Sequence, residues 1–223
     1  MGMYVSPETI YKTLYIQARG ALKKELISHL RRNHTYRQPA TASKRSETRG
    51  KIKDAISISS RPPEIEDRAV PGHWEGDSIE GAKGTFVATL VERQSRYVML
   101  VKVNSKETIE VTNKLRQKIK TLPDSMVKTL TWDRGHEMAN HVNFTIDTGI
   151  AVYFCDPRSP WQRGSNENTN GLLRQYLPKG MDLSTVSQQR LNQIAKLLNT
   201  RPRKTLGYIA PVDKLKESVA LRV

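Results

Sequence analysis

The order of predicted strands and helices between residues 71 and 155 constrains the fold of this chain more than any other feature. Three short segments rich in β-branched residues are separated by brief polar connections, at His73–Ile79, Thr85–Glu92 and Tyr97–Val103. Segments of this kind, joined so closely, predict an antiparallel meander of three strands.

Two further strands alternate with helices. The strands are predicted at Val127–Trp132 and Ala151–Cys155, and the helices at about 105–122 and 140–148, the second closing at Gly149. A β–α–β–α–β alternation after a meander predicts an α/β fold, a mixed sheet with helices on both faces.

Capping residues predict where several helices begin. Ser105 is expected to cap the helix that follows it, with Ile109, Leu115 and Ile119 on the buried face of that helix. Two more helices are expected near the C-terminus. They are predicted from Ser165 or Asn166 through Tyr176, and over about 187–198.

The first 70 residues have a different character. Ser6-Pro7-Glu8 predicts a helix start, and a second helix is expected from about residue 21 to 32. Eight basic residues and one acid occur between residues 31 and 53, with too few apolar side chains to form a core. The boundary with the sheet domain is expected near Pro71-Gly72. The predicted parts are a small basic helical segment (1–35), a basic flexible linker (36–70) and a core (71–223).

The charge distribution indicates a polyanionic partner. The chain has 37 Lys and Arg against 22 Asp and Glu, a net charge of +15. Basic residues dominate at both ends, 14 to 7 before residue 71 and 12 to 4 after residue 157, while the middle balances at 11 and 11. This pattern favours nucleic acid held on either side of an acidic site. Ordinary solubility charge or ribosomal association are the alternatives.

Several classes of protein are excluded by the sequence. No apolar run approaches the roughly 18–20 residues that a membrane span needs, and the start predicts a polar helix rather than a secretory signal. Cys155 is the single cysteine, which excludes an internal disulfide and a multi-cysteine zinc site. The sequence therefore predicts a cytoplasmic protein with no membrane partner.

Three acids are the candidate catalytic residues. Asp77 lies inside the first predicted strand, Asp133 ends the fourth, and Glu167 begins a helix. If the first and fourth strands are neighbours, the two aspartates lie side by side and need a cation or a shared proton. Carboxylate ligands without a Cys or His cluster favour Mg²⁺ or Mn²⁺ over zinc. Taken singly, each acid is explained equally well as a turn, cap or helix-dipole residue.

The sequence around these acids resembles a known family. Asp-Arg-Gly follows an apolar strand, and after Asp133 there are 33 residues before Glu167, which lies in Pro-Trp-Gln-Arg-Gly-Ser-Asn-Glu-Asn-Thr-Asn-Gly. This spacing is similar to the integrase-like catalytic core of DDE transposases. Pro-Gly-His-Trp-Glu-Gly-Asp (71–77), Leu-Pro-Lys-Gly (177–180) and Asn-Thr-Arg-Pro-Arg-Lys-Thr-Leu-Gly-Tyr (199–208) resemble one subgroup, the insertion-sequence-thirty family of bacterial mobile elements.

The resemblance implies a ribonuclease-H-like fold in which Asp77, Asp133 and Glu167 form the catalytic triad and hold two Mg²⁺ ions, with Mn²⁺ as a substitute. It implies a transposase that hydrolyses a phosphodiester at the end of the element and then uses the freed 3′-OH to attack target DNA. The implied partners are double-stranded DNA, both element ends and target, and further copies of the chain in a dimer or larger oligomer. The implied location is the bacterial nucleoid.

The N-terminal region departs from the family pattern. Such transposases carry a helix-turn-helix region ahead of the core, which reads the terminal repeats of the element. Residues 5–11 resemble the last, recognition-type helix of that region, and the helices expected before it are absent from the sequence. The resemblance therefore implies that residues 1–35 are a remnant with little sequence-specific binding, joined to an intact catalytic centre.

Further residues are candidates for DNA contact. Trp161 is placed to stack on a splayed base, with packing in the core as the alternative. Basic residues near Glu167 and in the C-terminal tail are candidates for phosphate contacts, with plain solvated charge as the alternative. They are Arg163, Arg174, Lys179, Arg201, Arg203 and Lys204. Glu137, four residues after Asp133, is either an outer residue of the site or a surface acid.

Two other functions stay open. A nuclease of the same fold would cut DNA without joining it. A truncated, non-catalytic DNA-binding protein would compete with, or regulate, the full-length transposase at DNA ends. The intact acid triad argues for catalysis, and the missing helices argue for the competitor. The sequence does not determine the terminal repeat, the target preference or the order of strand cleavages.

Overall fold

The computed structural model describes residues 5–6, 9–10, 25–26, 52–65, 70–133, 135–156 and 159–220. The chain divides into two units, 1–47 and 48–223. In the first unit the hydroxyl of Ser6 accepts a hydrogen bond from the backbone N–H of Thr9, as expected of a helix cap. The rest of the predicted helical segment and most of the basic stretch lie outside the described residues.

A five-stranded mixed sheet forms the centre of the second unit, in the order β3-β2-β1-β4-β5. The strands are β1 (His73–Glu80), β2 (Phe86–Glu92), β3 (Val98–Lys102), β4 (Thr129–Trp132) and β5 (Ala151–Phe154). β1 to β3 form an antiparallel meander, whereas β4 runs parallel to both β1 and β5. The predicted mixed sheet and its three-strand meander are confirmed, and so is the adjacency of the first and fourth strands.

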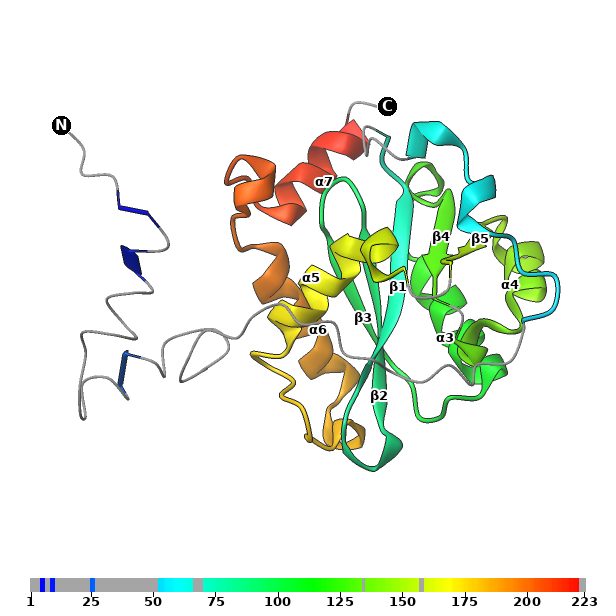
Figure 1. Cartoon of the computed structure of the whole chain (residues 1–223), viewed down its shortest axis with the longest axis horizontal. Helices are drawn as coiled ribbons and strands as arrows, with labels where there is room; N and C mark the ends of the chain where they lie inside the picture. The colour runs from blue at the N-terminus through cyan, green and yellow to red at the C-terminus, as the bar shows by residue number, and fades with distance from the viewer. Residues whose placement is uncertain are drawn as a thin grey trace. The chain divides into compact units, whose positions relative to one another are not determined.

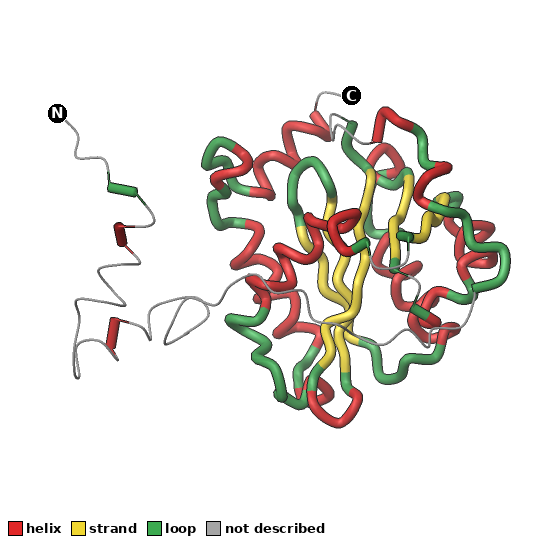
Figure 2. Tube along the Cα trace, viewed as in Figure 1, coloured by secondary structure: helices red, strands yellow, loops and turns green. Residues whose placement is uncertain are grey.

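Helices cover both faces of this sheet (Figure 1). The helices are α3 (Thr108–Ile119), α4 (His141–Thr148), α5 (Gly164–Leu173), α6 (Gln188–Asn199) and α7 (Pro211–Ala220). α3 and α4 contribute to one apolar core, and α5 and α6 contribute to the other. The strands consequently lie between two helical layers, as Figure 2 shows. Among the described residues, none of the helices combines the length and the apolar character needed to cross a membrane.

Short 3-10 helices occupy many of the connections. They are η2 (Ile58–Ser60), η3 (Pro63–Ile65), η4 (Ala82–Gly84), η5 (Asp124–Met126), η6 (His136–Met138), η7 (Pro160–Arg163), η8 (Leu183–Thr185) and η9 (Lys204–Leu206). Of these, η7 leads directly into α5 and so places the beginning of the helix that carries Glu167.

Alternation along β1 separates the two faces of the sheet. Trp74 belongs to the core under α3 and α4, and Ile79 belongs to the core under α5 and α6. Because successive side chains of a strand point to opposite faces, Glu75 and Asp77 lie on the α5 side with Ile79. Gly76 lies on the opposite side, where a Cβ atom would come within 2.1 Å of the Trp132 ring. The close approach of the Trp132 ring therefore requires glycine at this position.

Two predictions about α3 are wrong. Ser105 does not cap the helix: the N-cap position is Glu107, and the Ser105 hydroxyl bonds instead to the Glu110 carboxylate at 2.6 Å. Ile109 is 67 % exposed, whereas Val111 and Leu115 are buried. The N-cap lies two residues later than predicted. Ile109 lies six residues before Leu115, which is about 240° around the helix, so it faces away from the side that buries Val111 and Leu115.

Other helix ends follow the sequence more closely. The Ser187 hydroxyl caps α6 by accepting from the backbone N–H of Arg190 at 3.1 Å. Gly149 ends α4 in the left-handed conformation, with φ of 71°. The prediction that Ser165 or Asn166 begins the next helix is wrong, because both lie inside the first turn of α5, whose N-cap position is Arg163 and whose last residue is Leu173. α7 was not among the predicted helices.

Part of the predicted flexible linker packs against the sheet domain. The backbone N–H of Phe154 in β5 donates to the carbonyl of Ile56 at 2.8 Å, and Ser57 forms a parallel bridge with Phe154. Ile58 and Ile65 are buried. The expectation of mobility therefore does not hold for residues 52–65, because their few apolar side chains and backbone groups find partners on the edge strand of the sheet. The predicted boundary at Pro71-Gly72 lies inside the second unit, which begins at residue 48.

Candidate active site

Asp77 and Asp133 lie side by side at the middle of the sheet. The parallel register of β1 and β4 pairs Glu75 with Thr131, so two further residues bring Asp77 level with Asp133, just beyond the end of β4. Adjacent strands are about 4.8 Å apart. The sequence predicted the two aspartates on neighbouring strands. β1 and β4 are neighbours, with Asp77 inside β1 and Asp133 directly after β4.

A single guanidinium group lies between the two carboxylates. Arg163 Nη1 is 3.1 Å from Asp77 Oδ1, and Arg163 Nη2 is 3.7 Å from Asp133 Oδ2. Nη1 also donates to the carbonyl of Gly76 at 3.1 Å. Two like charges at this separation need a cation between them, and in this conformation Arg163 supplies it.

The surroundings shift the pKa of both charged partners. Burial raises the pKa of the Asp77 carboxyl; the Arg163 cation opposes that rise and the Asp133 carboxylate adds to it. Burial by itself would lower the pKa of Arg163, but the carboxylates of Asp77 and Asp133 raise it above the ordinary value. Arg163 therefore stays protonated, and Asp77 is held in a site where its negative charge requires compensation.

Glu167 approaches Asp77 from α5. It lies in the first turn of the helix, and it lines a pocket of about 350 Å³ together with Asp77, Asn170 and Arg174. Asn170, one turn further along the helix, donates its side-chain amide to Asp77 Oδ2 at 3.0 Å. The Glu167 side chain is exposed, so solvent and ligands reach it.

The donor set suits a hard divalent cation. Asp77 and Asp133 already share the positive charge of the Arg163 guanidinium. Their oxygen atoms are the ligand type that Mg²⁺ and Mn²⁺ prefer. Within the described part of the chain, no three Asp, Glu, His or Cys side chains are close enough together to share one ion. The oxygen atoms of the two aspartates suit such an ion, but the Arg163 guanidinium occupies the space between them, so it would have to move away. Glu167 would join the site only if its side chain moved toward the aspartates.

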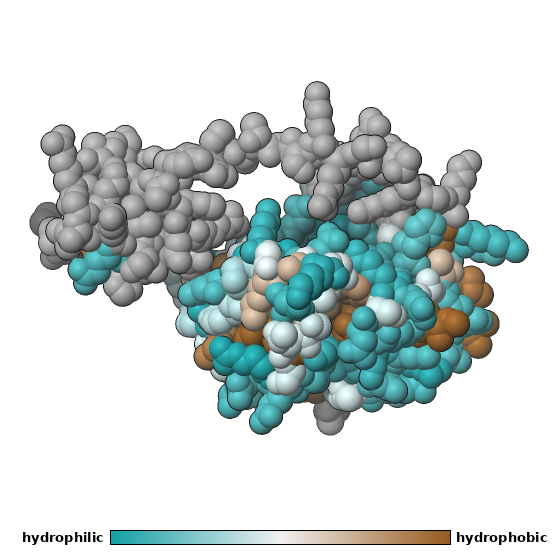
Figure 3. Space-filling model, turned by 90° about the horizontal axis from the view of Figure 1, so that it is seen from below, coloured by the Kyte–Doolittle hydropathy of each residue, from teal (hydrophilic) through white to brown (hydrophobic). Residues whose placement is uncertain are grey.

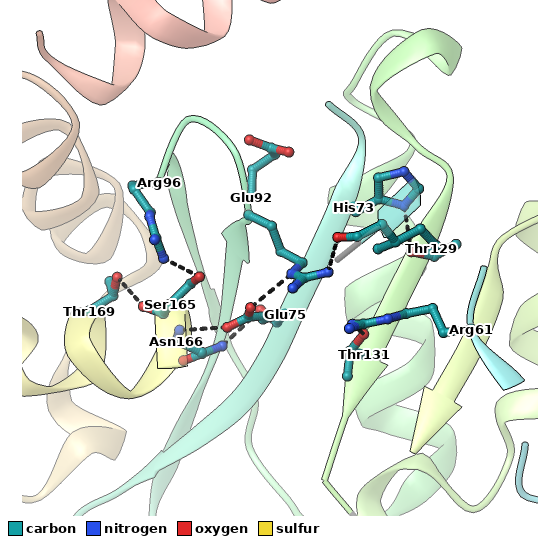
Figure 4. A network of polar contacts seen from close by, with 12 residues as sticks. Arg61, His73, Glu75, Glu92, Arg96, Thr129, Thr131, Ser165, Asn166 and Thr169 are labelled. Atoms are coloured by element: carbon teal, nitrogen blue, oxygen red, sulfur yellow. Dashed lines mark hydrogen bonds and ion pairs between the residues drawn. The ribbon is translucent and has the colours of Figure 1, made fainter. Parts of the chain in front are cut away.

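A buried polar network connects α5 to the strands beside the two aspartates (Figure 4). Glu75 is completely buried and pairs with Arg93, whose Nε lies 3.1 Å from Glu75 Oε1. The other carboxylate oxygen accepts the backbone N–H of Asn166 at 2.9 Å. Glu75, Arg93 and Asn170 were not among the predicted site residues. The signal for Glu75 was its period-two spacing from Asp77, which puts both acids on one face.

The candidate DNA-contact residues occupy different environments. Trp161 is 72 % exposed, so it does not pack in the core. Arg163 is buried between carboxylates rather than presented to a phosphate. Arg174 donates to the Glu80 carbonyl at 3.0 Å, and burial lowers its pKa. Lys179 and Lys204 are exposed.

The C-terminal arginines of the candidate set are held by the helices beside them. Arg201 donates to the Tyr176 hydroxyl at 2.8 Å, and Arg203 donates to the Leu198 carbonyl at 3.1 Å. Both remain partly exposed.

Figure 3 shows a mainly hydrophilic face with separate apolar areas.

Two residues near the site have clear environments. Glu137 turns back toward Asp133: a Cβ atom on Gly135 would lie within 3 Å of both the Glu137 carboxylate and Asp133 Oδ1. Glu137 is therefore an outer neighbour of the site. Cys155 is buried, and burial raises the pKa of its thiol to about 11, so it is not a nucleophile at neutral pH.

Several known proteins are similar to this chain in sequence, and a solved structure is similar to it in fold. Residues 67–160 match the family model of the integrase core domain. The Escherichia coli (strain K12) transposase InsI for insertion sequence element IS30A is 48 % identical over 219 residues, covering 97 % of this chain and 57 % of that protein. The Cupriavidus metallidurans transposase for insertion sequence element IS1086 is 50 % identical over 217 residues, covering 97 % of this chain and 63 % of that protein. The chain thus spans about three fifths of the length of these relatives.

A solved structure supports the fold independently. The catalytic core domain of BIV integrase matches with a TM-score of 0.53 and 20 % identity, covering 68 % of this chain and 97 % of that one. At this identity the similarity concerns the fold alone. The predicted ribonuclease-H-like architecture and the predicted family resemblance are both confirmed.

Proposed function

Because this chain is a homologue of the IS30-type transposases over nearly its whole length and contains an integrase core domain, we propose that it is a transposase acting in DNA strand cleavage and strand transfer of a bacterial insertion sequence. One structural observation carries the proposal most strongly. Asp77 on β1 and Asp133 directly after the adjacent parallel strand β4 lie around the Arg163 guanidinium, in a sheet that resembles an integrase core.

The proposed site residues are Asp77, Asp133 and Glu167, and the proposed cofactor is two Mg²⁺ ions, with Mn²⁺ as a substitute. Two such ions, when bound, stabilise the attacking and leaving oxygens of an in-line phosphoryl transfer. The aspartates supply ligand oxygens on the sheet, and Glu167 supplies them from the helix facing Asp77. Arg163 must leave the space between the aspartates, which frees its guanidinium for a DNA phosphate.

The proposed reaction has two phosphoryl transfers. Water attacks a phosphodiester at the end of the element and the P–O3′ bond breaks, leaving a 3′-OH and a 5′-phosphate. That 3′-OH then attacks a phosphodiester of the target, joining the element to one target strand and releasing the target's own 3′-OH. In both steps the protein aligns the attacking oxygen with the leaving oxygen.

The DNA partners follow from the same proposal. Element ends and target DNA are both double-stranded, and pairing two ends requires at least two copies of the chain. We propose that exposed Trp161, Lys179 and Lys204 contact DNA. Arg174, which lines the pocket, and Arg201 and Arg203 are proposed to contact its phosphates. Residues 1–35 and 36–70 are proposed as a helical DNA-binding segment and a basic connection to the core, and the place of action is the bacterial nucleoid.

One assay separates this function from its two competitors. A labelled duplex in which an element end is joined to flanking DNA is incubated with a supercoiled plasmid, the protein and Mn²⁺. A transposase gives cut duplex and plasmid covalently joined to the label. A nuclease gives cut duplex without joining, and a non-catalytic competitor gives a bound duplex that stays intact. Absence of joined product from a protein that binds the duplex would overturn the proposal.

A further inference from the structure

Glu75, a neighbour of the candidate site, accepts hydrogen bonds on both of its carboxylate oxygens. Glu75 shares the α5-facing side of β1 with Asp77, and it is completely buried. One of its carboxylate oxygens accepts from Arg93 Nε and the other accepts from the backbone N–H of Asn166. These contacts suit a carboxylate that holds neighbouring elements in place rather than one that binds a ligand.

Asn166 forms the other side of this contact. Its side-chain amide donates to the backbone carbonyl of Glu75 at 2.8 Å, and its Oδ1 accepts from the Thr89 hydroxyl at 3.0 Å. Asn166 is completely buried and directly precedes Glu167. With a longer contact from its amide to the Thr89 carbonyl at 3.5 Å, Asn166 makes four hydrogen bonds that attach the first turn of α5 to β1 and β2. Figure 4 shows Asn166 reaching toward Glu75.

Thr89 connects the network to the other catalytic acid. It is the cross-strand partner of Asp77 in the β1–β2 pairing, and its hydroxyl lies 3.2 Å from the Asp77 carbonyl. The same hydroxyl therefore contacts both the backbone of Asp77 and the residue beside Glu167. Because the Glu167 side chain is exposed, its position depends on the helix backbone rather than on packing around it.

We propose that Asn166, held by Glu75 and Thr89, is a positioning residue that sets the separation between Glu167 on α5 and Asp77 on β1. The inference rests on the proposed function, because it requires Glu167 and Asp77 to act on the same phosphate. Arg93 extends the attachment by donating to the Ile65 carbonyl at 2.5 Å, which connects the network to the segment before the sheet.

A matched asparagine elsewhere in the fold provides the control. Asn199 at the end of α6 is also buried, and its side-chain amide bridges a helix to a strand: it accepts from the backbone N–H of Val98 at 2.8 Å and donates to the Val98 carbonyl at 2.9 Å. Asn166→Ala and Asn199→Ala remove similar buried contacts, and only the first touches the site. Both should lower Tm by several degrees.

The two variants should differ in catalysis. At a temperature where both are folded, Asn166→Ala should cut a labelled element-end duplex about 10- to 100-fold more slowly, since small misplacements of reacting groups have effects of this size. Its DNA affinity should stay unchanged, and its Mn²⁺ affinity without DNA, measured by electron paramagnetic resonance, should fall several-fold. Asn199→Ala should match the wild type in cleavage rate, DNA affinity and Mn²⁺ affinity. Equal cleavage rates and Mn²⁺ affinities for the two variants would overturn the proposal.

A conservative pair at Thr89 tests the same network without a large cavity. Thr89→Val removes the hydroxyl and keeps the shape, so it should slow cleavage about tenfold. Thr89→Ser keeps the hydroxyl and should restore the wild-type rate. Equal rates for these two would show that the hydroxyl does not position the site.

Failure of this inference is distinguishable from failure of the proposed function. The cleavage rate of Glu167→Gln is measured in the same assay as those of Asn166→Ala and Asn199→Ala. If Glu167→Gln is inactive while Asn166→Ala behaves as Asn199→Ala does, the positioning role is refuted and the transposase function stands. If Glu167→Gln is fully active, the proposed triad itself is refuted.

Discussion

The two faces of the central sheet use the same strands in different ways. The face under α3 and α4 is apolar, and it includes Trp74, Leu90 and Trp132, each with 1 % exposure or less. The face under α5 and α6 is apolar toward β3 but carries the charged side chains of Glu75 and Asp77 on β1. The face under α3 and α4 therefore stabilises the sheet. The face under α5 and α6 carries buried charges over part of its area, and buried charges stabilise a fold weakly at best.

The difference shows how a functional site is kept inside a stable domain. Alternation along a strand lets Trp74 and Gly76 contribute to one face while Glu75 and Asp77 face the other. Substitutions on the α3 face should therefore alter stability with little effect on chemistry, and substitutions of the site acids should do the reverse. The predictions below test that division, from the largest expected effect to the smallest.

The largest effect is expected at the three acids. Asp77→Asn, Asp133→Asn and Glu167→Gln should each reduce cleavage of an element-end duplex by about 10⁴-fold or more, because the amide keeps the shape but removes charge that the cations need. Circular dichroism should show an intact fold. Asp213→Asn on α7 is the control and should retain full activity. Full activity in any of the three variants would remove that residue from the site.

The next effect is a loss of stability on the opposite face. Trp132→Ala should lower the free energy of unfolding by about 3–5 kcal/mol, because the ring is completely buried in the apolar core. Urea denaturation measures this. Where the variant remains folded, its cleavage rate should stay close to the wild-type rate. A rate that falls as far as that of Asp77→Asn would show that the two faces do not act separately.

Gly76 lies where the two faces meet. Gly76→Ala should destabilise the protein by about 1–3 kcal/mol, since its Cβ would overlap the Trp132 ring, 2.1 Å away. Combining it with Trp132→Leu should cost less than the sum of the two single changes, because the smaller side chain makes room. Strict additivity in denaturation measurements would contradict the packing described here.

A variant of Arg163 tests whether a metal ion can replace its guanidinium between Asp77 and Asp133. Arg163→Gln should raise the affinity of the protein for Mn²⁺ by several-fold, because the ion no longer competes with the guanidinium for Asp77 and Asp133. Isothermal titration calorimetry measures this. Arg116→Gln, which removes the same charge from a pair with Asp147 on the other face, is the control. A lower Mn²⁺ affinity in Arg163→Gln would contradict competition.

The smallest effect concerns the C-terminal basic tail. Neutralising Arg201, Arg203 and Lys204 together should weaken binding to every duplex alike and reduce the slope of log affinity against log salt by up to about three units. Phosphate contacts carry little sequence information, so element-end and scrambled duplexes should respond equally. A salt titration of both duplexes measures this. Loss of affinity for the element end alone would indicate base recognition in the tail.

Local signals predicted much of the fold, and non-local contacts account for most of what was missed. Gly149 was identified correctly as the end of α4 because glycine readily adopts the left-handed conformation found there. The predicted helix over about 187–198 is also confirmed, with Ser187 as its cap. Ile109 was assigned to the wrong side because it lies six residues, about 240° around the helix, from the buried Leu115.

The candidate site shows the same division. The proximity of Asp77 and Asp133 could be predicted because β1 and β4 are neighbours in the sheet, whereas the pairing of Arg163 with both of them joins residues 30 and 86 positions apart. The Glu75–Asn166 contact spans 91 positions. Such contacts depend on how α5 crosses the sheet, and no local pattern encodes that crossing.

The central claim, that Asp77, Asp133 and Glu167 together hold two divalent ions, is tested most directly by counting bound Mn²⁺. Titration of DNA-bound protein, followed by electron paramagnetic resonance, should give two ions per site in the wild type. Asp77→Asn, Asp133→Asn and Glu167→Gln should each bind fewer ions or bind them at least about tenfold more weakly, whereas Asp147→Asn on the opposite face should bind two as before. Unchanged stoichiometry and affinity in the three acid variants would contradict the account.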